Sequence, residues 1–313
     1  MIFGHCFLGW FLFNDEVVNI ESSDFISILF KTLSPFIAII SVIVGCSFYF
    51  WIGRKKPSLK KVLAKSLLLI ALCFALNLLI WGTEDMFSWD ALAFYGLSFI
   101  VAFALINYSV KLLYFAGVIT LFGGHFLREL FSKFSENYIY MIILGDKTGF
   151  NYWPFFPWFS LFVAGYLLSD IYMKKRNKYL LPIGISLLLL SLITKNFLFN
   201  YDPNNIWGPQ IFIINPIRVL GMIGLVIILL ETIEKINSKK DNLFKNLLKV
   251  YSYSILPVYL YHLIIGNYLL SIINKNNYLL LVIYLIFMLV SSYFIGKKYI
   301  SLKNSNSLKI SSK

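Results

Sequence analysis

The chain has 313 residues, of which 59% are hydrophobic and only 14% are charged. A soluble domain averages roughly 45–50% apolar and about 25% charged residues, so this composition excludes a water-soluble globular protein. Lys and Arg number 28 against 15 Asp and Glu, an excess that would suggest nucleic acid in a soluble protein. Here the basic residues lie in short clusters between apolar runs, which is typical of cytoplasmic loops and argues against a nucleic-acid partner.

Apolar segments long enough to cross a bilayer recur along the chain. A span needs about 20 apolar residues, and the sequence offers nine full segments after an incomplete one at Met1–Phe13. The full segments are 33–53, 62–82, 90–109, 112–127, 155–173, 179–195, 211–231, 253–273 and 278–296. We therefore expect an all-α integral membrane protein, a polytopic bundle of about ten transmembrane helices. Residues 1–299 would form one transmembrane domain, and 300–313 a disordered tail.

The first segment is too short to cross the membrane alone. As a helix, Met1–Phe13 reaches only about 20 Å, against a hydrocarbon core of about 30 Å. Either this helix enters from part-way across the membrane, or the chain lacks its natural start. We favour the second and expect a truncated first helix. The segment lacks a basic leader, so we expect no cleavable signal peptide.

The placement of Lys and Arg predicts the orientation. Alternate loops carry most of the basic residues, as the positive-inside rule requires of cytoplasmic loops. These basic stretches are 54–65, 111, 174–178, 235–249 and 297–313. Both termini are then cytoplasmic, in the plasma (cytoplasmic) membrane. The long outer segments 128–154 and 196–210 are placed to cover a pocket on the outer face.

Ionisable side chains inside membrane spans are costly and mark candidate functional sites. His5, Arg218 and His262 are of this kind. A rise of about 1.5 Å per residue places all three between mid-membrane and the outer third, so we expect them to line one outward-opening cavity. A neutral His can take a proton from a hydroxyl or amine. Arg218, about seven residues into its helix, can hold an anion or stabilise an oxyanion.

Each polar candidate has a structural alternative. An intramembrane His often only hydrogen-bonds across helices, and Arg218 can bind a carbonyl that Pro216 leaves unpaired. Asn77, in the segment 62–82, is either a substrate contact or a hydrogen bond between helices. Asp170 and Glu231 lie at cytoplasmic helix ends, where we expect solvated charges. At the outer interface, a charge without a functional role is likewise the favoured interpretation for His125, Arg128 and Glu129. The cysteines, Cys6, Cys46 and Cys73, lie in apolar segments without metal-ligand spacing, so we expect no metal.

Three stretches carry a more specific signal. They are Met1–His5 (MIFGH) with Leu33–Phe36 (LSPF) and Val44–Tyr49 (VGCSFY); Pro154–Phe159 (PFFPWF) with Gly165; and Tyr253–His262 (YSILPVYLYH). Together they resemble the heparan-alpha-glucosaminide N-acetyltransferase family, within the superfamily of transmembrane acyltransferases that modify surface glycans. The first stretch is similar to that family's first helix, which ends in a His, and to a second helix with a Gly-x-Ser turn. The Arg and the Arg-Gly pair that normally precede the His are not in this chain.

The resemblance implies that the domain is an acyltransferase. It would move an acyl group, acetyl in the family pattern, from acetyl-CoA or a related acyl-CoA to a sugar hydroxyl or amine of an extracytoplasmic glycan or lipid-linked saccharide. The expected partners are the lipid bilayer and this acceptor, with a homodimer left open. The resemblance implies that His5 is catalytic. The assigned residues are His5 and His262 for catalysis, Arg218, Asn77 and Trp158 for substrate, and Arg54, Lys55 and Lys56 for the donor phosphates.

Two other functions stay open. A transporter or flippase for an anionic or sugar-linked solute would also place Arg218 in a helix broken by Pro216. Proton-coupled transport usually needs an intramembrane carboxylate, and Asp170 and Glu231 are expected at helix ends, which disfavours it. The third interpretation is a non-catalytic remnant of an acyltransferase.

Overall fold

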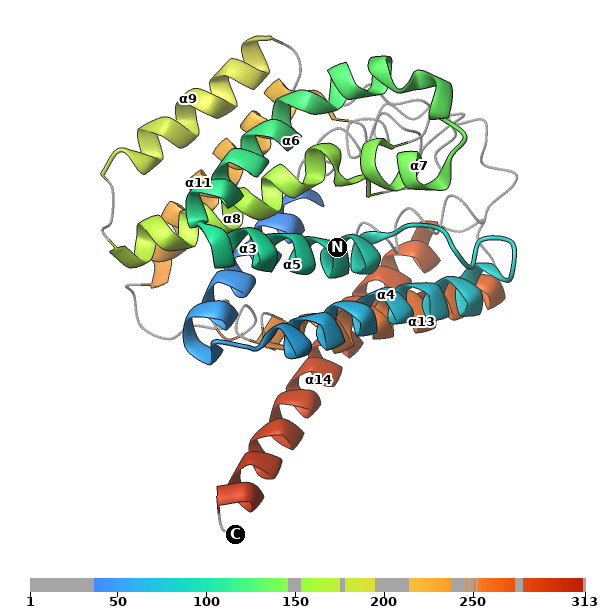
Figure 1. Cartoon of the computed structure of the whole chain (residues 1–313). Coiled ribbons are helices and arrows are strands. Elements are labelled where there is room, and N and C mark those ends of the chain that lie inside the picture. The colour runs from blue at the N-terminus through green and yellow to red at the C-terminus, as the bar shows by residue number, and fades with distance from the viewer. Residues whose placement is uncertain are drawn as a thin grey trace. The chain divides into compact units, whose positions relative to one another are not determined.

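The computed structural model describes residues 37–145, 153–174, 178–194, 214–237, 246, 250–251, 253–273 and 278–311. These ranges are built of helices and contain no strand, which confirms the all-α prediction for them (Figure 1). The helices are α3 (Ile37–Lys55), α4 (Leu59–Trp81), α5 (Ala91–Tyr108), α6 (Val110–Leu130), η4 (Ser132–Phe134), α7 (Tyr138–Leu144), α8 (Phe155–Lys174), α9 (Leu180–Ile193), α11 (Pro216–Asn237), α13 (Ile255–Ile272) and α14 (Tyr278–Ser311).

Seven of these helices are long and apolar enough to cross a membrane. They are α4, α5, α6, α8, α11, α13 and α14. Helix α9 is apolar but has only 14 residues, fewer than the roughly 20 that a span needs. Each of the nine full segments expected from the sequence overlaps a helix, but the count of about ten spans is not confirmed.

The outward side chains of these helices fit a lipid environment. Large apolar residues are exposed along several of them, among them Leu79 of α4, Phe126 of α6 and Ile193 of α9. In water such extensive apolar exposure would drive association, whereas lipid tails accept it. The chain is an integral membrane protein.

The chain divides into two compact units, Ser23–Thr232 and a unit that joins Met1–Ser22 with Ile233–Lys313. We call them the larger and the smaller unit. In the larger unit, α8 is the central helix, and α3, α5, α6 and α7 pack against it. Its core is aromatic: the Phe48 ring of α3 lies 4.9 Å from the Phe99 ring and 5.4 Å from that of Phe162.

Helices α3 and α8 touch backbone to backbone. A Cβ on Gly45 would lie 2.0 Å from the Phe162 carbonyl oxygen, and one on Gly165 would lie 2.0 Å from that of Val42. Small residues commonly allow such close approach between membrane helices. The family resemblance implies a Gly-x-Ser turn at Gly45, and that expectation is wrong. The glycine lies within α3, and it is required by the neighbouring helix, not by a turn.

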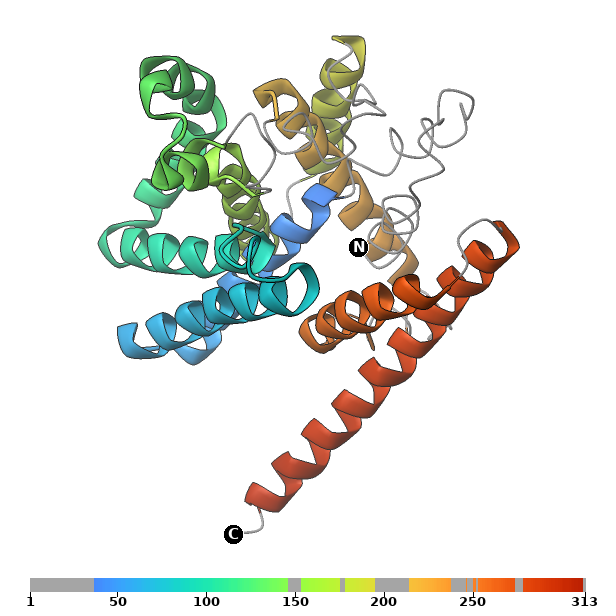
Figure 2. The same cartoon turned by 90° about the vertical axis from the view of Figure 1, so that its right-hand side faces the viewer.

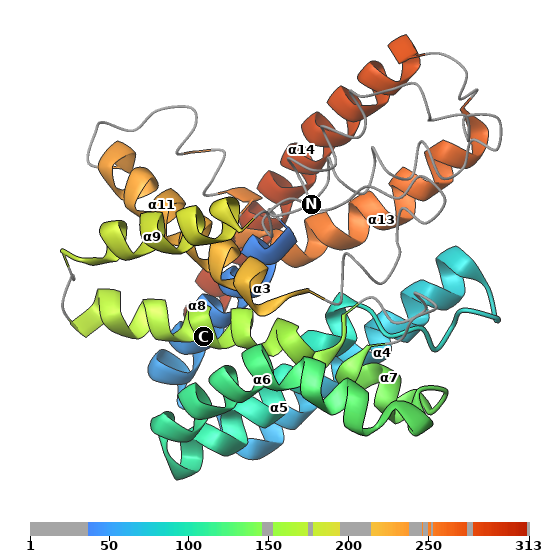
Figure 3. The same cartoon turned by 90° about the horizontal axis from the view of Figure 1, so that it is seen from above.

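Each unit contains a further pair of helices in contact. In the larger unit, α9 lies beside α11 (Figure 3), where a Cβ on Gly224 would come within 2.5 Å of the Gly184 carbonyl oxygen. In the smaller unit, α13 and α14 form an antiparallel pair (Figure 2), and the Tyr284 hydroxyl donates to the Gly266 carbonyl at 3.1 Å. Helix α14 is assigned to Ser311 and so enters the segment 300–313, expected as a tail. The division into one transmembrane domain and a tail stays a prediction.

Candidate functional site

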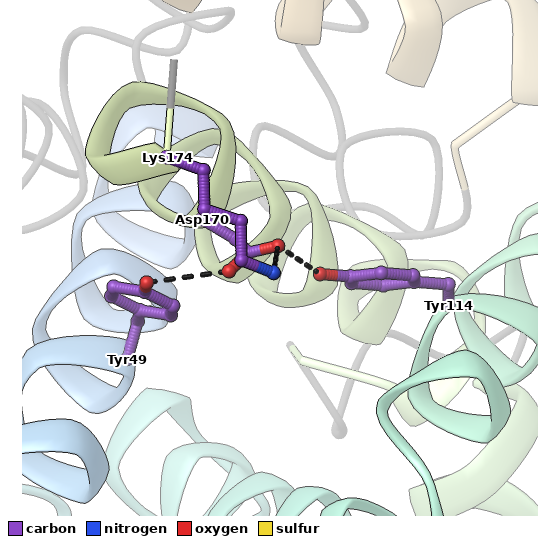
Figure 4. Close-up of polar contacts among 4 residues, drawn as sticks. All are labelled: Tyr49, Tyr114, Asp170 and Lys174. Atoms are coloured by element: carbon purple, nitrogen blue, oxygen red, sulfur yellow. Dashed lines mark hydrogen bonds and ion pairs between the residues drawn. The ribbon is translucent and has the colours of Figure 1, made fainter.

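A polar cluster of Tyr49, Tyr114, Asp170 and Lys174, which we call the Asp170 cluster, joins three helices of the larger unit where α3 ends, α6 begins and α8 ends (Figure 4). The Asp170 carboxylate of α8 accepts hydrogen bonds from the Tyr49 hydroxyl of α3 and the Tyr114 hydroxyl of α6, each at 3.3 Å. Lys174, one turn further along α8, forms an ion pair with it at 2.9 Å. The Asp170 side chain is 16% exposed and that of Lys174 is 74% exposed. The expectation of a solvated helix-end charge is therefore wrong for Asp170.

The second carboxylate expected to be solvated, Glu231, is buried. Its Oε1 accepts a hydrogen bond from the Tyr172 hydroxyl at 2.6 Å, which ties α8 to α11. The last two turns of α8 therefore bind α3, α6 and α11 through polar side chains. A buried carboxylate needs such donors, because an unpaired one would be strongly destabilising.

Basic residues surround this end of the larger unit. Arg54, Lys55 and Lys56, predicted to bind the donor phosphates, lie at and just after the end of α3 and are exposed. The Arg54 guanidinium lies over the Phe50 ring, 5.3 Å from its centroid. Lys111, in the first turn of α6, is exposed as well. Their position keeps these cations accessible to an anionic ligand; their binding role stays a prediction.

Trp158, predicted to bind substrate, lies at the other end of α8, within the aromatic core. Its ring is buried and lies 4.3 Å from the Trp153 ring. The backbone carbonyl of Trp153 in turn accepts a hydrogen bond from Trp89 Nε1 at 3.0 Å. Protein covers Trp158 in this structure, and its substrate contact stays a prediction.

Arg128, near the end of α6, joins the end of α7 to the start of α8. Its Nε donates to the Leu144 carbonyl at 2.5 Å, and its Nη2 donates to the Phe156 carbonyl at 3.0 Å. Phe156 has non-helical torsion angles (φ −95°, ψ 122°), so its carbonyl is turned out of the helical ladder. Arg128 is expected to be a charge at the outer interface without a functional role; that expectation stays a prediction, and the side chain binds two backbone carbonyls. By contrast, His125 and Glu129 form an exposed pair at 3.3 Å.

Replacing Arg128 by alanine should lower the free energy of unfolding by about 2–4 kcal/mol, because two carbonyls lose a charged donor. The measurement is thermal unfolding of the purified protein in detergent. Lys133→Ala is the matched control, since Lys133 is an exposed cation in η4 of the same region. Equal midpoints for the two variants would contradict the assigned role of Arg128.

Asn77 is buried near the end of α4 and fastens the loop that follows. Its Nδ2 donates to the Ser88 carbonyl at 2.7 Å and lies 3.4 Å from the Met86 carbonyl. The next residues start α5, where the Asp90 carboxylate accepts from the Ala91 N–H at 2.6 Å. Burial raises the pKa of the Asp90 carboxyl, and this hydrogen bond opposes the rise. The contacts of Asn77 are structural; its substrate role stays a prediction.

Arg218 lies in the first turn of α11, because that helix begins at Pro216. Proline suits a helix start since it has no N–H to leave unpaired, and the Asn215 side chain accepts from the Ile217 N–H at 2.8 Å. The expectation that Arg218 lies about seven residues into its helix is therefore wrong. Its side chain is partly buried.

His262 is a buried residue of α13, only 1% exposed. Its Nδ1 lies 3.0 Å from the Val258 carbonyl oxygen one turn earlier, and because a carbonyl can only accept, Nδ1 is the donor of this hydrogen bond. His262 belongs to the smaller unit and Arg218 to the larger one, while His5 lies outside the described residues. The cavity that these three residues are expected to share stays a prediction.

The comparison with protein families bears directly on this chain. The model described as heparan-alpha-glucosaminide N-acetyltransferase, catalytic, matches residues 1–202, which is more than half of the sequence. The chain belongs to this family. Membership confirms the resemblance seen in the sequence. No curated protein and no solved structure gives a match.

The part of the chain that matches the heparan-alpha-glucosaminide N-acetyltransferase family contains both the predicted catalytic His5 and the Asp170 cluster. Arg218 and His262 lie beyond it. Across the described ranges, no three His, Cys, Asp or Glu side chains are grouped so that they could hold a metal ion. Of the Asp170 cluster, the sequence itself signals only the pair Asp170 and Lys174 at a spacing of four residues. The tyrosines come from distant segments and carry no local signal.

Proposed function

We propose that the protein moves an acetyl group from acetyl-CoA to a hydroxyl or amine of a sugar on the outer side of the membrane. The match to a catalytic family model over residues 1–202 carries the proposal. The apolar helices support a membrane setting for this reaction. The acceptor is a glycan or a lipid-linked saccharide.

His5 is the proposed general base, with His262 as a second candidate for catalysis. The acceptor oxygen or nitrogen would attack the thioester carbonyl while His5 takes its proton. The carbon–sulfur bond then breaks, and the proton goes from the imidazole to the departing thiolate of CoA. A His suits both steps, because its ordinary pKa lies close to the working pH.

The donor is proposed to arrive at the basic end of the larger unit, which we place on the cytoplasmic side. Acetyl-CoA carries several phosphates, and exposed cations attract them. Arg54, Lys55 and Lys56 are the proposed contacts, and their exposure supports this role. Arg218, Asn77 and Trp158 are retained as proposed contacts for the acceptor.

The alternative function is transport of an anionic or sugar-linked solute. One observation favours it more than the sequence did, because Asp170 and Glu231 are largely buried. Buried carboxylates in membrane helices are typical of proton relays. Arg218, in the first turn of α11, would then hold the anionic solute.

Purified protein in detergent, given labelled acetyl-CoA and a panel of amino sugars, tests the proposal. We expect label on a sugar and release of free CoA in equal amount. Release of CoA without labelled sugar would point to hydrolysis alone. If neither product forms while thermal unfolding shows a folded protein, acetyl transfer is contradicted and solute uptake becomes the function to measure.

A further inference from the structure

The Asp170 cluster is more than a packing contact. A carboxylate in this position loses hydrating water, which costs free energy. Apolar side chains of similar volume often stabilise such a site as well or better. Ionisable residues within membrane segments are therefore functional candidates by default. At 16% exposure, Asp170 has exchanged most of its water for two hydroxyls and one ammonium group.

The two tyrosines that Asp170 holds lie close to exposed cations. Tyr49 precedes Arg54 and Lys55 on α3, about 8 Å away along the helix axis for Arg54. Tyr114 follows Lys111 on α6, at about 5 Å along that axis. Both hydroxyls bind one carboxylate of α8. The cluster thus fixes where two helix ends, and the cations on them, stand relative to α8.

Charge within the cluster suits an anionic ligand nearby. The ion pair with Lys174 at 2.9 Å offsets the negative charge of Asp170. Arg54, Lys55 and Lys111 are exposed, so an anionic ligand can reach them. A ligand with several phosphates would gain most from cations held at fixed spacing, because less side-chain and helix freedom is lost on binding.

The tyrosine rings have a second support that does not involve the carboxylate. Tyr166, one turn before Asp170, packs its ring 5.0 Å from that of Tyr49 and 6.5 Å from that of Tyr114. A Tyr→Phe change at either position therefore keeps the ring contact and removes only the hydrogen bond to Asp170. These variants separate the polar link from the packing.

We infer that Asp170 is a positioning residue for the acyl donor. Through Tyr49 and Tyr114, Asp170 holds the basic ends of α3 and α6 against the donor's phosphates. The inference rests on the proposed function, because it takes acetyl-CoA as the ligand. Asp170 does not touch the reacting atoms. Asp170 affects the affinity for the donor, and it affects neither the affinity for the acceptor nor the rate of the chemical step.

The test uses the full chain in nanodiscs and measures the Kd for acetyl-CoA by calorimetry, together with KM for each substrate and kcat. The variants are Asp170→Asn, the double change Tyr49→Phe with Tyr114→Phe, Arg54→Gln, and Asp170→Asn combined with Arg54→Gln. Tyr108→Phe is the matched control, since Tyr108 ends α5 and is 84% exposed. Thermal unfolding verifies that each variant is folded. If Asp170→Asn is not folded, the Tyr49→Phe and Tyr114→Phe double variant tests the inference in its place.

We expect Asp170→Asn and the Tyr→Phe pair to raise the Kd and KM for acetyl-CoA by about tenfold, an ordinary size for coupled side chains. The acceptor KM and kcat should change by less than about twofold, and Tyr108→Phe should match the wild type. In the combined Asp170→Asn and Arg54→Gln variant, the fold-increase in Kd should be smaller than the product of the two single fold-increases. The reason is that Arg54 already contributes little to binding once Asp170→Asn has displaced it.

Three results would overturn the inference. The first is a Kd for acetyl-CoA in the folded variants equal to that of the wild type. The second is a fold-increase in Kd for the combined Asp170→Asn and Arg54→Gln variant equal to the product of the two single fold-increases. In both cases the wild type still binds and transfers acetyl, so the proposed function stands. A folded wild type that does not bind acetyl-CoA at all would remove the proposed function and this inference together.

Discussion

Replacement of His5 by alanine should lower the rate of acetyl transfer by about 10²–10⁴-fold, the contribution typical of a general acid or base. The reason is chemical: without the imidazole, no group is left at that position to take the acceptor's proton and return it to the CoA thiolate. His5 lies within the residues that match the family model. The measurement is labelled acetyl transfer at saturating acetyl-CoA and amino sugar.

His125→Ala is the matched control for that experiment. His125 is 81% exposed at the end of α6 and pairs only with Glu129 among the contacts seen there. Its loss should change the rate by less than about twofold. Equal activity of His5→Ala and His125→Ala would remove His5 from the catalytic machinery and leave His262 as the histidine to test.

A methyl group at Gly165 should force α3 away from α8. In Gly165→Ala the new Cβ would lie 2.0 Å from the Val42 carbonyl oxygen, and backbone cannot rotate aside as a side chain can. Overpacking costs typically 1–3 kcal/mol and occasionally more, and we expect about 3 kcal/mol here. The thermal midpoint in detergent should fall by about 5–10 °C.

The control for Gly165 is another helical glycine with open space around it. Gly53 lies in α3, and nothing stands within 4 Å of a Cβ added there. Gly53→Ala should be neutral or should stabilise the protein by up to about 1 kcal/mol through helix propensity. A Gly165→Ala protein as stable as Gly53→Ala would show that α3 and α8 do not touch as described.

The sequence alone predicts the helices well, because apolar length dominates in a membrane protein. The segments 62–82, 90–109 and 155–173 differ by only a few residues from α4, α5 and α8. The segment 112–127 is too short, since α6 runs from Val110 to Leu130. The helix continues past the polar Arg128, whose side chain binds carbonyls of α7 and α8.

Positions that depend on a neighbouring segment could not be predicted. Gly45 suggested a turn, yet its reason is the backbone of α8 beside it. Asp170 was expected to be solvated, yet its hydroxyl partners stand 121 and 56 residues away in sequence. A single sequence contains no trace of such pairings. Among the described residues, the tertiary contacts decide both the packing and the burial of the charges.

The predicted site residues illustrate the same limit. Asn77 and Trp158 were chosen by residue type and motif, and the structure gives both a buried place with partners of their own. Helix starts matter as well, since Pro216 moves Arg218 into the first turn of α11. Arg54, Lys55 and Lys56 are exposed, as a phosphate contact requires.

Acetyl transfer from a cytoplasmic donor to an acceptor across the membrane is the proposed activity. It is tested most directly in proteoliposomes that hold amino sugar inside and receive labelled acetyl-CoA outside. We expect labelled sugar inside the vesicles and free CoA outside, with both products formed about 10²–10⁴-fold more slowly by His5→Ala. Sugar that leaves the vesicles unacetylated would overturn acetyl transfer and identify a transporter, and labelled sugar formed equally by His5→Ala would overturn the proposed role of His5.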